Sequence, residues 1–513
     1  MSTTLSNEGE DLISFWKKVF DQNASLASIP FETYDFYHDC ILRHCGKHLT
    51  AVKDKENAWS YDDIHTLVGY QLPFWKNHGL SPGQKVTLVF SHGIDFIVAL
   101  MTALKLGLSF SLSFLDDPLY SLERIERKIK EEQPQWIVTS LNHQKWEKQT
   151  LHWNLEIQEE NTLEEPSHAY LPVEEISPQL DANKGFLCPL RDGLITLSLK
   201  PGTTWAHPLG LLSQEEPFIT LATFLAGATL LLVSDSTLEQ DPLFLKETPI
   251  EVLSISPRLL ELWTQNPGVP KSKLKLWTLS PLLGNLPQKA AFVEQNALAK
   301  IPHLQVHIQT KQGGITLASK TQPYQSFISL KPSPGIPWKI LELNGSNQVS
   351  WEGVGLFSLD PSLILGETPD GFVISKIKKP IRKGVTYPSD EIESIIQECE
   401  GVHECMIVEN QTPLDLIGSR LTLLIFAPDQ KEEDISNLNE KLNILLCKQL
   451  GEGNLPDRIL SFPLYPRKKD GKLDRQWVLG QYHEGNLSKK TKSSLHLQLS
   501  HVRNILYKEL ERP

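Results

Sequence analysis

Apolar residues alternate between helical and strand spacing along the first half of the chain. The segment 59–80 carries apolar residues on one helical face, and Ser60 precedes them in a position suited to an N-cap. Residues 81–90 form a turn and an apolar, β-rich run, and residues 93–108 return to helical spacing and close at Gly107. A strand, a charged amphipathic helix and another strand follow at short intervals. This order predicts an α/β fold with a parallel sheet covered by helices.

The same alternation returns after a long apolar run. The run Phe218–Val233 is shorter than the ~20 residues of a membrane-crossing helix and contains Gly227, so it predicts a buried helix that turns into a core strand. Strands and helices then alternate as far as residue 310. From about residue 332 the pattern changes to short strands separated by glycine and proline, which predicts a small β-subdomain over 332–374.

A chain of 513 residues exceeds the size at which one hydrophobic core stops growing, so several domains are expected. The pattern predicts a large N-terminal part over 1–374 and a small, mobile α+β domain over 375–480. A basic, proline-containing stretch from Ser375 to Gly384 is the predicted hinge. The tail 481–513 has apolar residues at helical spacing, and it either docks on its own domain or binds a partner.

Composition narrows the class of protein. Apolar residues make up 40% and charged residues 22%, as in soluble globular proteins, and the formal charge of −12 argues against nucleic acid as a partner. The N-terminus has acidic residues before its first apolar stretch and no basic region, so no secretory signal is expected. We therefore expect a cytoplasmic protein without a transmembrane segment.

The chain has six cysteines and no CxxC pair, so neither a zinc site nor a redox pair is expected. Free, mostly buried thiols in a reducing compartment are the prediction. No metal ligand is assigned from the sequence.

Four stretches together resemble the adenylate-forming superfamily, which includes acyl-CoA synthetases, adenylation domains of peptide synthetases and luciferases. The resemblance spans about residues 35–480, and its most specific part is "PRKKDGKLDR", Pro466 to Arg475, which matches the catalytic-lysine loop of the superfamily. The other three are "WSYDDI…LSPGQKVTLVFSHGIDFIVALMTALKLG", "KPGTTWAHPLG" and "GVTYPSDEIESIIQECEGVHECMIV". The resemblance implies a large two-subdomain α/β part followed by a small C-terminal domain.

The resemblance also implies a reaction and its cofactors. A small carboxylic acid would attack the α-phosphate of ATP in the presence of magnesium, and the acyl group of the resulting adenylate would pass to a thiol of CoA or of a carrier protein. Lys472 would supply the cation beside the carboxylate and the α-phosphate, where negative charge grows in the transition state.

The phosphate loop departs from the superfamily pattern. Gly202, Thr203 and Thr204 could offer backbone N–H groups and hydroxyls to phosphates. However, Trp205 stands where a second glycine is usual and Leu209 stands where a lysine is usual. Two interpretations stay open: a working phosphate loop, or a structural turn.

Other site positions also differ. The superfamily's aromatic-Gly-x-Thr-Glu motif corresponds to "QTKQGG", 309–314, which has neither the ring nor the carboxylate, and Asp360 is the carboxylate nearest to the ribose-binding position. Each lost charge-assisted contact is worth about 1.5–3 kcal/mol. The sequence thus leaves two classes open, and whether the protein is an enzyme stays undecided. It is a divergent acid–thiol ligase, or a catalytically inactive relative that acts as an acyl-binding or protein-interaction module.

Overall fold

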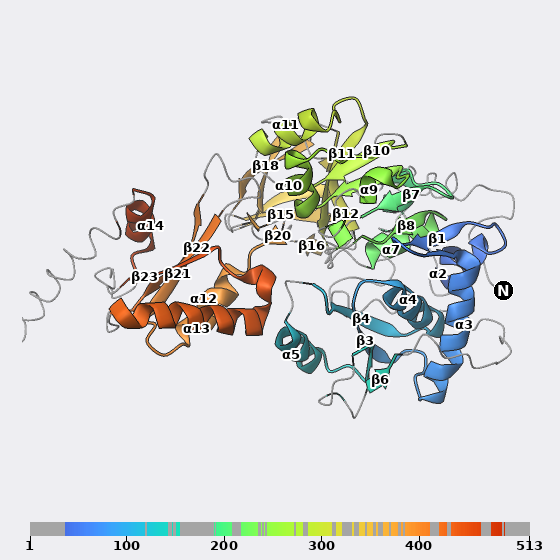
Figure 1. Cartoon of the computed structure of the whole chain (residues 1–513), viewed down its shortest axis with the longest axis horizontal. Helices are drawn as coiled ribbons and strands as arrows, with labels where there is room; N and C mark the ends of the chain where they lie inside the picture. The colour runs from blue at the N-terminus through green and yellow to red at the C-terminus, as the bar shows by residue number, and fades with distance from the viewer. Residues whose placement is uncertain are drawn as a thin grey trace, which may run out of the picture. The chain divides into compact units, whose positions relative to one another are not determined.

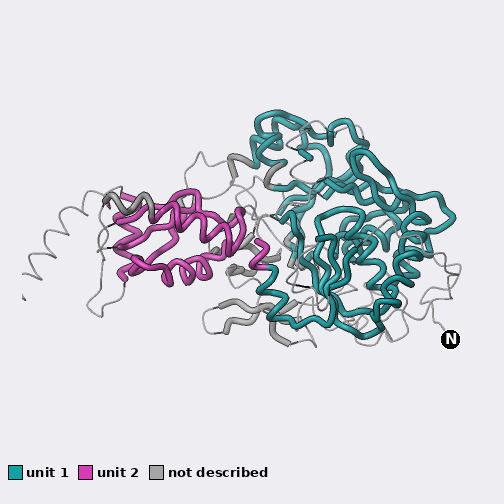
Figure 2. The backbone as a smooth tube through the Cα atoms, turned by 60° about the horizontal axis from the view of Figure 1, so that its bottom comes forward, with its two compact units in different colours: residues 1–120, 125–378, 383–385 teal, residues 121–124, 379–382, 386–513 magenta. Residues whose placement is uncertain are grey.

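The computed structural model divides the chain into two compact units, coloured separately in Figure 2. Unit 1 comprises residues 1–120, 125–378 and 383–385, and unit 2 comprises residues 121–124, 379–382 and 386–513. The predicted domain limits and the mobility of the small domain stay predictions. The structure describes residues 36–117, 121–141, 146, 150–153, 189, 191–207, 217–233, 237–238, 241, 244–270, 273–280, 286–309, 314–320, 331–332, 338–343, 346–351, 355–357, 363–368, 371–377, 381–382, 385–410, 420–427, 432–462, 473–484 and 487.

The largest sheet of unit 1 has nine strands in the described part of the chain, in the order β13-β12-β11-β10-β9-β7-β8-β1-β2. The inner strands from β11 to β1 all run parallel, and β2, β12 and β13 pair antiparallel at the two ends. The strands are β1 (Thr50–Lys53), β2 (Ala58–Ser60), β7 (Thr204–Ala206), β8 (Thr229–Leu231), β9 (Val252–Ile255), β10 (Leu276–Leu279), β11 (His303–Gln309), β12 (Gly314–Ser319) and β13 (Lys331–Pro332).

Helices connect and cover these strands. Among them, α10 and α11 pack on β9 and β10 through one apolar cluster that includes Trp263, Trp277 and Phe292 (Figure 1). The helices and turns of this part are η5 (Asp192–Thr196), α7 (Phe218–Leu225), α9 (Phe244–Glu247), α10 (Pro257–Gln265) and α11 (Leu286–Gln295). The run Phe218–Val233 is a fully buried helix, α7, followed by strand β8, as the sequence predicted.

A second sheet of unit 1 is entirely parallel, in the order β4-β3-β5-β6. Its elements follow the predicted alternation: β3 (Lys85–Phe90), α4 (Ile94–Leu106), β4 (Ser109–Phe114), α5 (Leu122–Glu132), β5 (Trp136–Thr139) and β6 (Thr150–His152). Gly107 ends α4 with a φ of 70°, a backbone conformation that glycine adopts without strain. The predicted α/β architecture is confirmed in both sheets.

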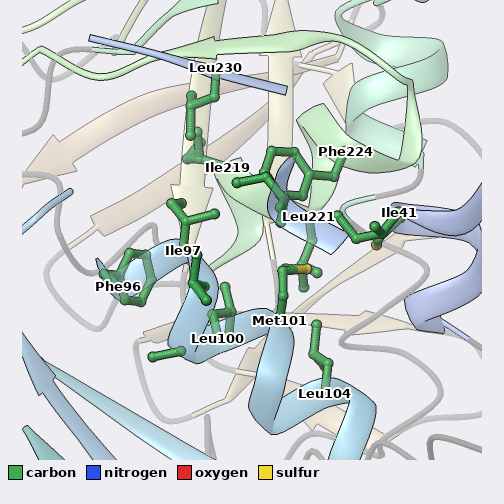
Figure 3. Packing of buried hydrophobic residues seen from close by; sticks show 14 of the residues in the cluster. Ile41, Phe96, Ile97, Leu100, Met101, Leu104, Ile219, Leu221, Phe224 and Leu230 are labelled. Atoms are coloured by element: carbon green, nitrogen blue, oxygen red, sulfur yellow. The ribbon is translucent and has the colours of Figure 1, made fainter. Parts of the chain in front are cut away.

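The helices that precede this sheet begin the described part of the chain: α2 (Phe36–Cys40), η3 (Leu42–His44) and α3 (Tyr61–Asn77). Ser60 caps α3 as predicted, because its hydroxyl accepts the Asp63 N–H while the Asp63 carboxylate accepts the Ser60 N–H. The two sheets share one apolar core, to which α4 contributes Phe96, Ile97 and Leu100 and α7 contributes Leu221 and Phe224 (Figure 3).

Short strands follow the large sheet, where the sequence predicted a β-subdomain. They are β14 (Trp338–Leu343), β15 (Ser346–Trp351), β16 (Gly355–Phe357), β17 (Leu363–Thr368), β18 (Gly371–Ile377), β19 (Ile381–Arg382) and β20 (Val385–Thr386). The pairs β14–β15, β15–β16 and β17–β18 are antiparallel.

Unit 2 is an α+β domain with a three-stranded sheet in its described part, in the order β21-β22-β23. The strands β22 and β23 are parallel and are joined by α13, and β21 is antiparallel to β22. Apolar clusters form on both faces of the sheet. The elements are α12 (Ser389–Gln397), β21 (Glu404–Asn410), β22 (Arg420–Phe426), α13 (Glu432–Leu450), η8 (Glu452–Asn454), β23 (Arg458–Phe462) and α14 (Arg475–His483). Across all described residues, no helix is long and apolar enough to cross a membrane.

Candidate functional site

The stretch Lys200–Thr203 is a tight turn. The Thr203 N–H donates to the Lys200 carbonyl at 2.9 Å, Pro201 occupies the second position, and Gly202 has a φ of 77° at the third. These are the features of a type II turn, which requires a positive φ at its third residue. The Gly202 N–H donates to the carbonyl of Gly227 at 2.9 Å, and the Thr203 hydroxyl accepts the Lys200 N–H at 3.1 Å.

The turn leads directly into β7, a central strand of the large sheet. Thr204 is the first residue of β7, and Trp205 is a buried strand residue whose indole N–H donates to the Ser254 hydroxyl at 3.0 Å. Gly202, Thr203 and Thr204 therefore lie at the amino end of a parallel strand, whereas open α/β sheets bind ligands beyond the carboxyl ends. The two backbone N–H groups of the turn are already paired, so this geometry does not fit a phosphate chain. A phosphate contact at these residues stays a prediction without support from the turn.

The carboxyl edge of the same strands carries a different set of residues. His207 directly follows β7, Ser256 follows β9 and Ser280 follows β10. His207 is buried, with its ring 5.6 Å from that of Trp205, and the Ser256 hydroxyl caps α10 by accepting the Leu259 N–H at 3.2 Å. These residues were not predicted from the sequence, although a polar residue directly after an apolar strand marks this edge.

A short hydrogen-bonded row lies on the strands beneath this edge. The Ser254 hydroxyl accepts the indole N–H of Trp205 and the hydroxyl of Thr278, both at 3.0 Å. All three side chains are buried, so each polar group has its partner within the sheet. The row ties β7, β9 and β10 together and fixes the spacing of the residues that follow them.

The "QTKQGG" segment joins β11 to β12. Gln309 pairs with Gly314 in an antiparallel register, and residues 310–313 lie outside the described part of the chain. One residue further, a buried ion pair holds both backbone groups of Ile315: the Ile315 N–H donates to Asp192 Oδ2 at 2.6 Å, and Arg191 Nη2 donates to the Ile315 carbonyl at 2.5 Å. Burial raises the pKa of the Asp192 carboxyl, although the adjacent guanidinium of Arg191 opposes this shift.

Two predicted site residues, Lys472 and Asp360, lie outside the described residues. The residues that follow Lys472 are described and are held firmly. Leu473 is buried in the core of unit 2, the Asp474 carboxylate caps α14 by accepting the Trp477 N–H at 3.2 Å, and Arg475 pairs with Glu393 at 2.6 Å. The carboxyl-terminal side of the predicted lysine loop is therefore anchored by three independent contacts.

Magnesium needs oxygen ligands, usually carboxylates. Among the described residues, no group of three or more His, Cys, Asp or Glu side chains could hold a metal ion. Neither the turn at Gly202 nor the described ends of "QTKQGG" supplies a carboxylate, so the described residues define neither an ATP site nor a magnesium site.

Comparisons with known proteins identify the fold. No protein-family model and no curated protein matches the sequence. Among solved structures, the amide bond synthetase McbA from Marinactinospora thermotolerans is 13% identical with a TM-score of 0.69, over 88% of this chain and 100% of that chain. A double mutant of o-succinylbenzoate CoA synthetase (MenE) from Bacillus subtilis is 13% identical with a TM-score of 0.68, over 86% of this chain and 97% of that chain.

A third similar structure is an artificially fused adenylation–PCP di-domain from Klebsiella oxytoca. It is 12% identical with a TM-score of 0.59, over 83% of this chain and 85% of that chain. The class of fold is therefore that of adenylate-forming enzymes, and the recognition made from the four sequence stretches is confirmed at the level of the fold.

Proposed function

We propose that the protein is an AMP-forming ligase with a divergent site, which activates a small carboxylic acid as an acyl-adenylate and transfers the acyl group to a thiol of CoA or of a carrier protein. ATP and magnesium are the cofactors that this proposal implies. The solved structures with the same fold include a CoA synthetase and an adenylation domain fused to a carrier domain, which supports a thiol as the acceptor.

The anchored loop after Lys472 is the observation that carries the proposal. A catalytic lysine has to be held in place by the residues around it, because a misplaced side chain forfeits much of its effect. Leu473, Asp474 and Arg475 each make a contact that fixes the backbone next to Lys472. The free state of the described cysteines accords with a reducing compartment such as the cytoplasm.

A second candidate function is a catalytically inactive relative that binds an acyl compound or another protein. The turn at Gly202 favours it, because the N–H groups of Gly202 and Thr203 are already paired and lie at the amino end of β7. A protein of this kind would keep the fold and lack turnover.

ATP–pyrophosphate exchange across a panel of aliphatic, aromatic and hydroxylated carboxylic acids separates the two functions. The ligase predicts exchange that depends on one class of acid, and addition of CoA should convert that acid into a thioester detected by mass spectrometry. Absence of exchange with every acid, together with saturable binding of one acid in calorimetry, would instead establish the inactive relative.

A further inference from the structure

A histidine–aspartate pair extends the register of the second sheet. Strands β3 and β4 are parallel, and Phe90 pairs with Phe114 at their carboxyl ends. Two residues further along each strand direction stand His92 and Asp116. His92 Nδ1 lies 2.8 Å from Asp116 Oδ1, and the His92 backbone N–H donates to both carboxylate oxygens at 3.1 Å. The strand register thus brings His92 and Asp116 together, although they are 24 positions apart in the sequence.

The imidazole ring of His92 has one fixed orientation. It stacks on Phe114 with the ring centroids 3.9 Å apart and the planes 5° from parallel, and its side chain is only 5% exposed. Nε2 is enclosed by the protein and has no hydrogen-bond partner in the structure. A buried polar atom without a hydrogen-bond partner destabilises the fold, so this nitrogen is suited to receive a partner from a ligand.

The ionisation of Asp116 influences whether His92 Nε2 acts as a hydrogen-bond donor or acceptor. Burial acts to raise the pKa of the Asp116 carboxyl, but the hydrogen bonds from His92 outweigh burial and lower the pKa below its ordinary value. In the tautomer that carries its proton on Nδ1, His92 donates to this carboxylate and keeps a lone pair on Nε2. In this state Nε2 accepts a hydrogen bond, so its ligand has to be a donor.

The order of the strands also marks this edge for ligand binding. The chain passes from β3 through α4 to β4 on one side, and then through α5 to β5 on the other side of β3. The order β4-β3-β5-β6 is that of flavodoxin-like sheets, in which ligands bind where the connections diverge, at the carboxyl ends of the first and third strands. Those strands are β3 and β5 here, and His92 lies in the turn that directly follows β3.

The charged residues near the pair of His92 and Asp116 favour a positively charged ligand. Asp95 stands in the first turn of α4, and Asp116 and Asp117 follow β4. The segments 86–104 and 106–122 contain no Lys or Arg, and the intervening Lys105 lies over the ring of Tyr37. A site flanked by carboxylates raises the local concentration of cations and repels anions.

We propose that the carboxyl edge of β3 and β4 binds a small amine-bearing ligand, whose N–H donates to His92 Nε2 while the Asp116 carboxylate holds Nδ1 on the far side of the ring. This site is independent of the proposed ligase activity. Because Nε2 is enclosed, the ligand has to be small or the turn Ser91–Gly93 has to open.

The test uses the full-length protein labelled with ¹⁵N at histidine. Methylamine, ethylamine and propylamine are titrated at neutral pH, with methanol, ethanol and propanol as neutral counterparts. The amines should move the His92 Nε2 resonance saturably and the alcohols should not. Asp116→Asn should weaken amine binding about tenfold, because it removes the negative charge on the far side of the ring while the ligand contact at Nε2 stays.

His92→Phe keeps a ring able to stack on Phe114 and removes both nitrogens, so it assigns the resonance and should abolish amine-dependent thermal stabilisation. His78→Phe, at an exposed histidine after α3, is the matched control and should retain that stabilisation. No shift with any amine, equal shifts with the alcohols, or an unchanged amine response in His92→Phe would each overturn the proposal.

Discussion

His44 is buried against a backbone with no room for a side chain. It is 4% exposed, and a Cβ added at Gly227 would lie 2.8 Å from the His44 ring. Burial lowers the pKa of His44 to about 4, with Lys47 and Arg43 acting in the same direction. The ring is therefore neutral in the folded protein across a pH range in which the unfolded chain binds a proton.

This difference predicts acid sensitivity. Below the unfolded pKa of 6.5 the unfolded state takes up a proton that the folded state refuses until about pH 4, so stability is full above pH 6.5 and falls toward pH 4. The loss through His44 is on the order of 3 kcal/mol. Urea unfolding of wild type and of His44→Gln at several pH values measures it.

The stability difference between wild type and His44→Gln should shrink as the pH falls from 6.5 to 4, because the variant lacks the titrating group. His48→Gln, at an exposed histidine nearby, is the control and should follow wild type at every pH. A difference that stays constant with pH would show that His44 takes up its proton without unfolding.

Lys472 carries the prediction for catalysis. If the proposed ligase activity is present, Lys472→Ala should lower ATP–pyrophosphate exchange by roughly 10²–10³, the effect of removing one positioned charge from a transition state. Lys469→Ala, in the same basic segment, is the matched control and should change exchange little. Equal exchange in wild type and Lys472→Ala would contradict the assignment of the catalytic lysine.

A sequence motif can locate candidate site residues without showing their positions in the fold. The residues Gly202, Thr203 and Thr204 match a phosphate-loop pattern, but the sequence does not show at which end of a strand they lie. In the structure they lie at the amino end of β7, and the N–H groups of Gly202 and Thr203 are already hydrogen-bonded. The pair of His92 and Asp116 went unpredicted because strand register brings it together. A helix cap such as Ser60 is local, so it could be read directly.

The strand β12 is held at its start by buried side chains as well as by its neighbour β11. The pairing of β11 with β12 shifts between His307 and Ile308, and the backbone of Ile315, which lies opposite Ile308, also bonds to Arg191 and Asp192. The two side chains are 1% and 6% exposed. The buried ion pair therefore supports the strand next to the point where the ladder is irregular.

Breaking this pair should be costly. Asp192→Asn leaves the Arg191 guanidinium buried without its counter-charge, so we expect a loss of about 3–5 kcal/mol in urea unfolding. Glu251→Gln is the control, because its partner Lys275 is 74% exposed and such a pair contributes about 0–1 kcal/mol. Equal losses in the two variants would mean that the buried pair is replaceable by neutral hydrogen bonds.

Helices and strands could be predicted where the apolar residues of a segment follow one spacing, either helical or strand-like. The helix α4 and the strands β3, β4 and β5 coincide with the predicted runs, because each buries an apolar face or is buried throughout. The order of strands in the two sheets was not predictable, because it depends on pairing between distant segments.

The chain connects unit 1 to unit 2 within a basic segment. Residues 379–382 group with unit 2 and residues 383–385 with unit 1, so the chain crosses between the units more than once there. If Ser375 to Gly384 is the hinge, trypsin should cut first at its lysines or Arg382 and release two fragments that resist further digestion.

Replacing the basic residues of 376–383 by glutamine should delay that first cut and leave cuts elsewhere unchanged. Mass spectrometry of the earliest fragments checks both expectations. A first cut inside either unit, with 375–384 intact, would count against the hinge.

Strand β1 of the large sheet pairs with β8, which is synthesised much later. Thr50, at the start of β1, bonds to Thr229 of β8 across 179 positions, and the whole second sheet lies between them in sequence. At roughly 5–20 residues per second on the ribosome, those 179 residues take roughly 9–36 s to synthesise. During that interval β1 has no β8 to join, while β3 to β6 are synthesised and can pair with one another. Strand β1 can pair with β2 at once, but its other edge, which later joins β8, stays open throughout this interval, and such an open edge is a site that a ribosome-associated chaperone can cover.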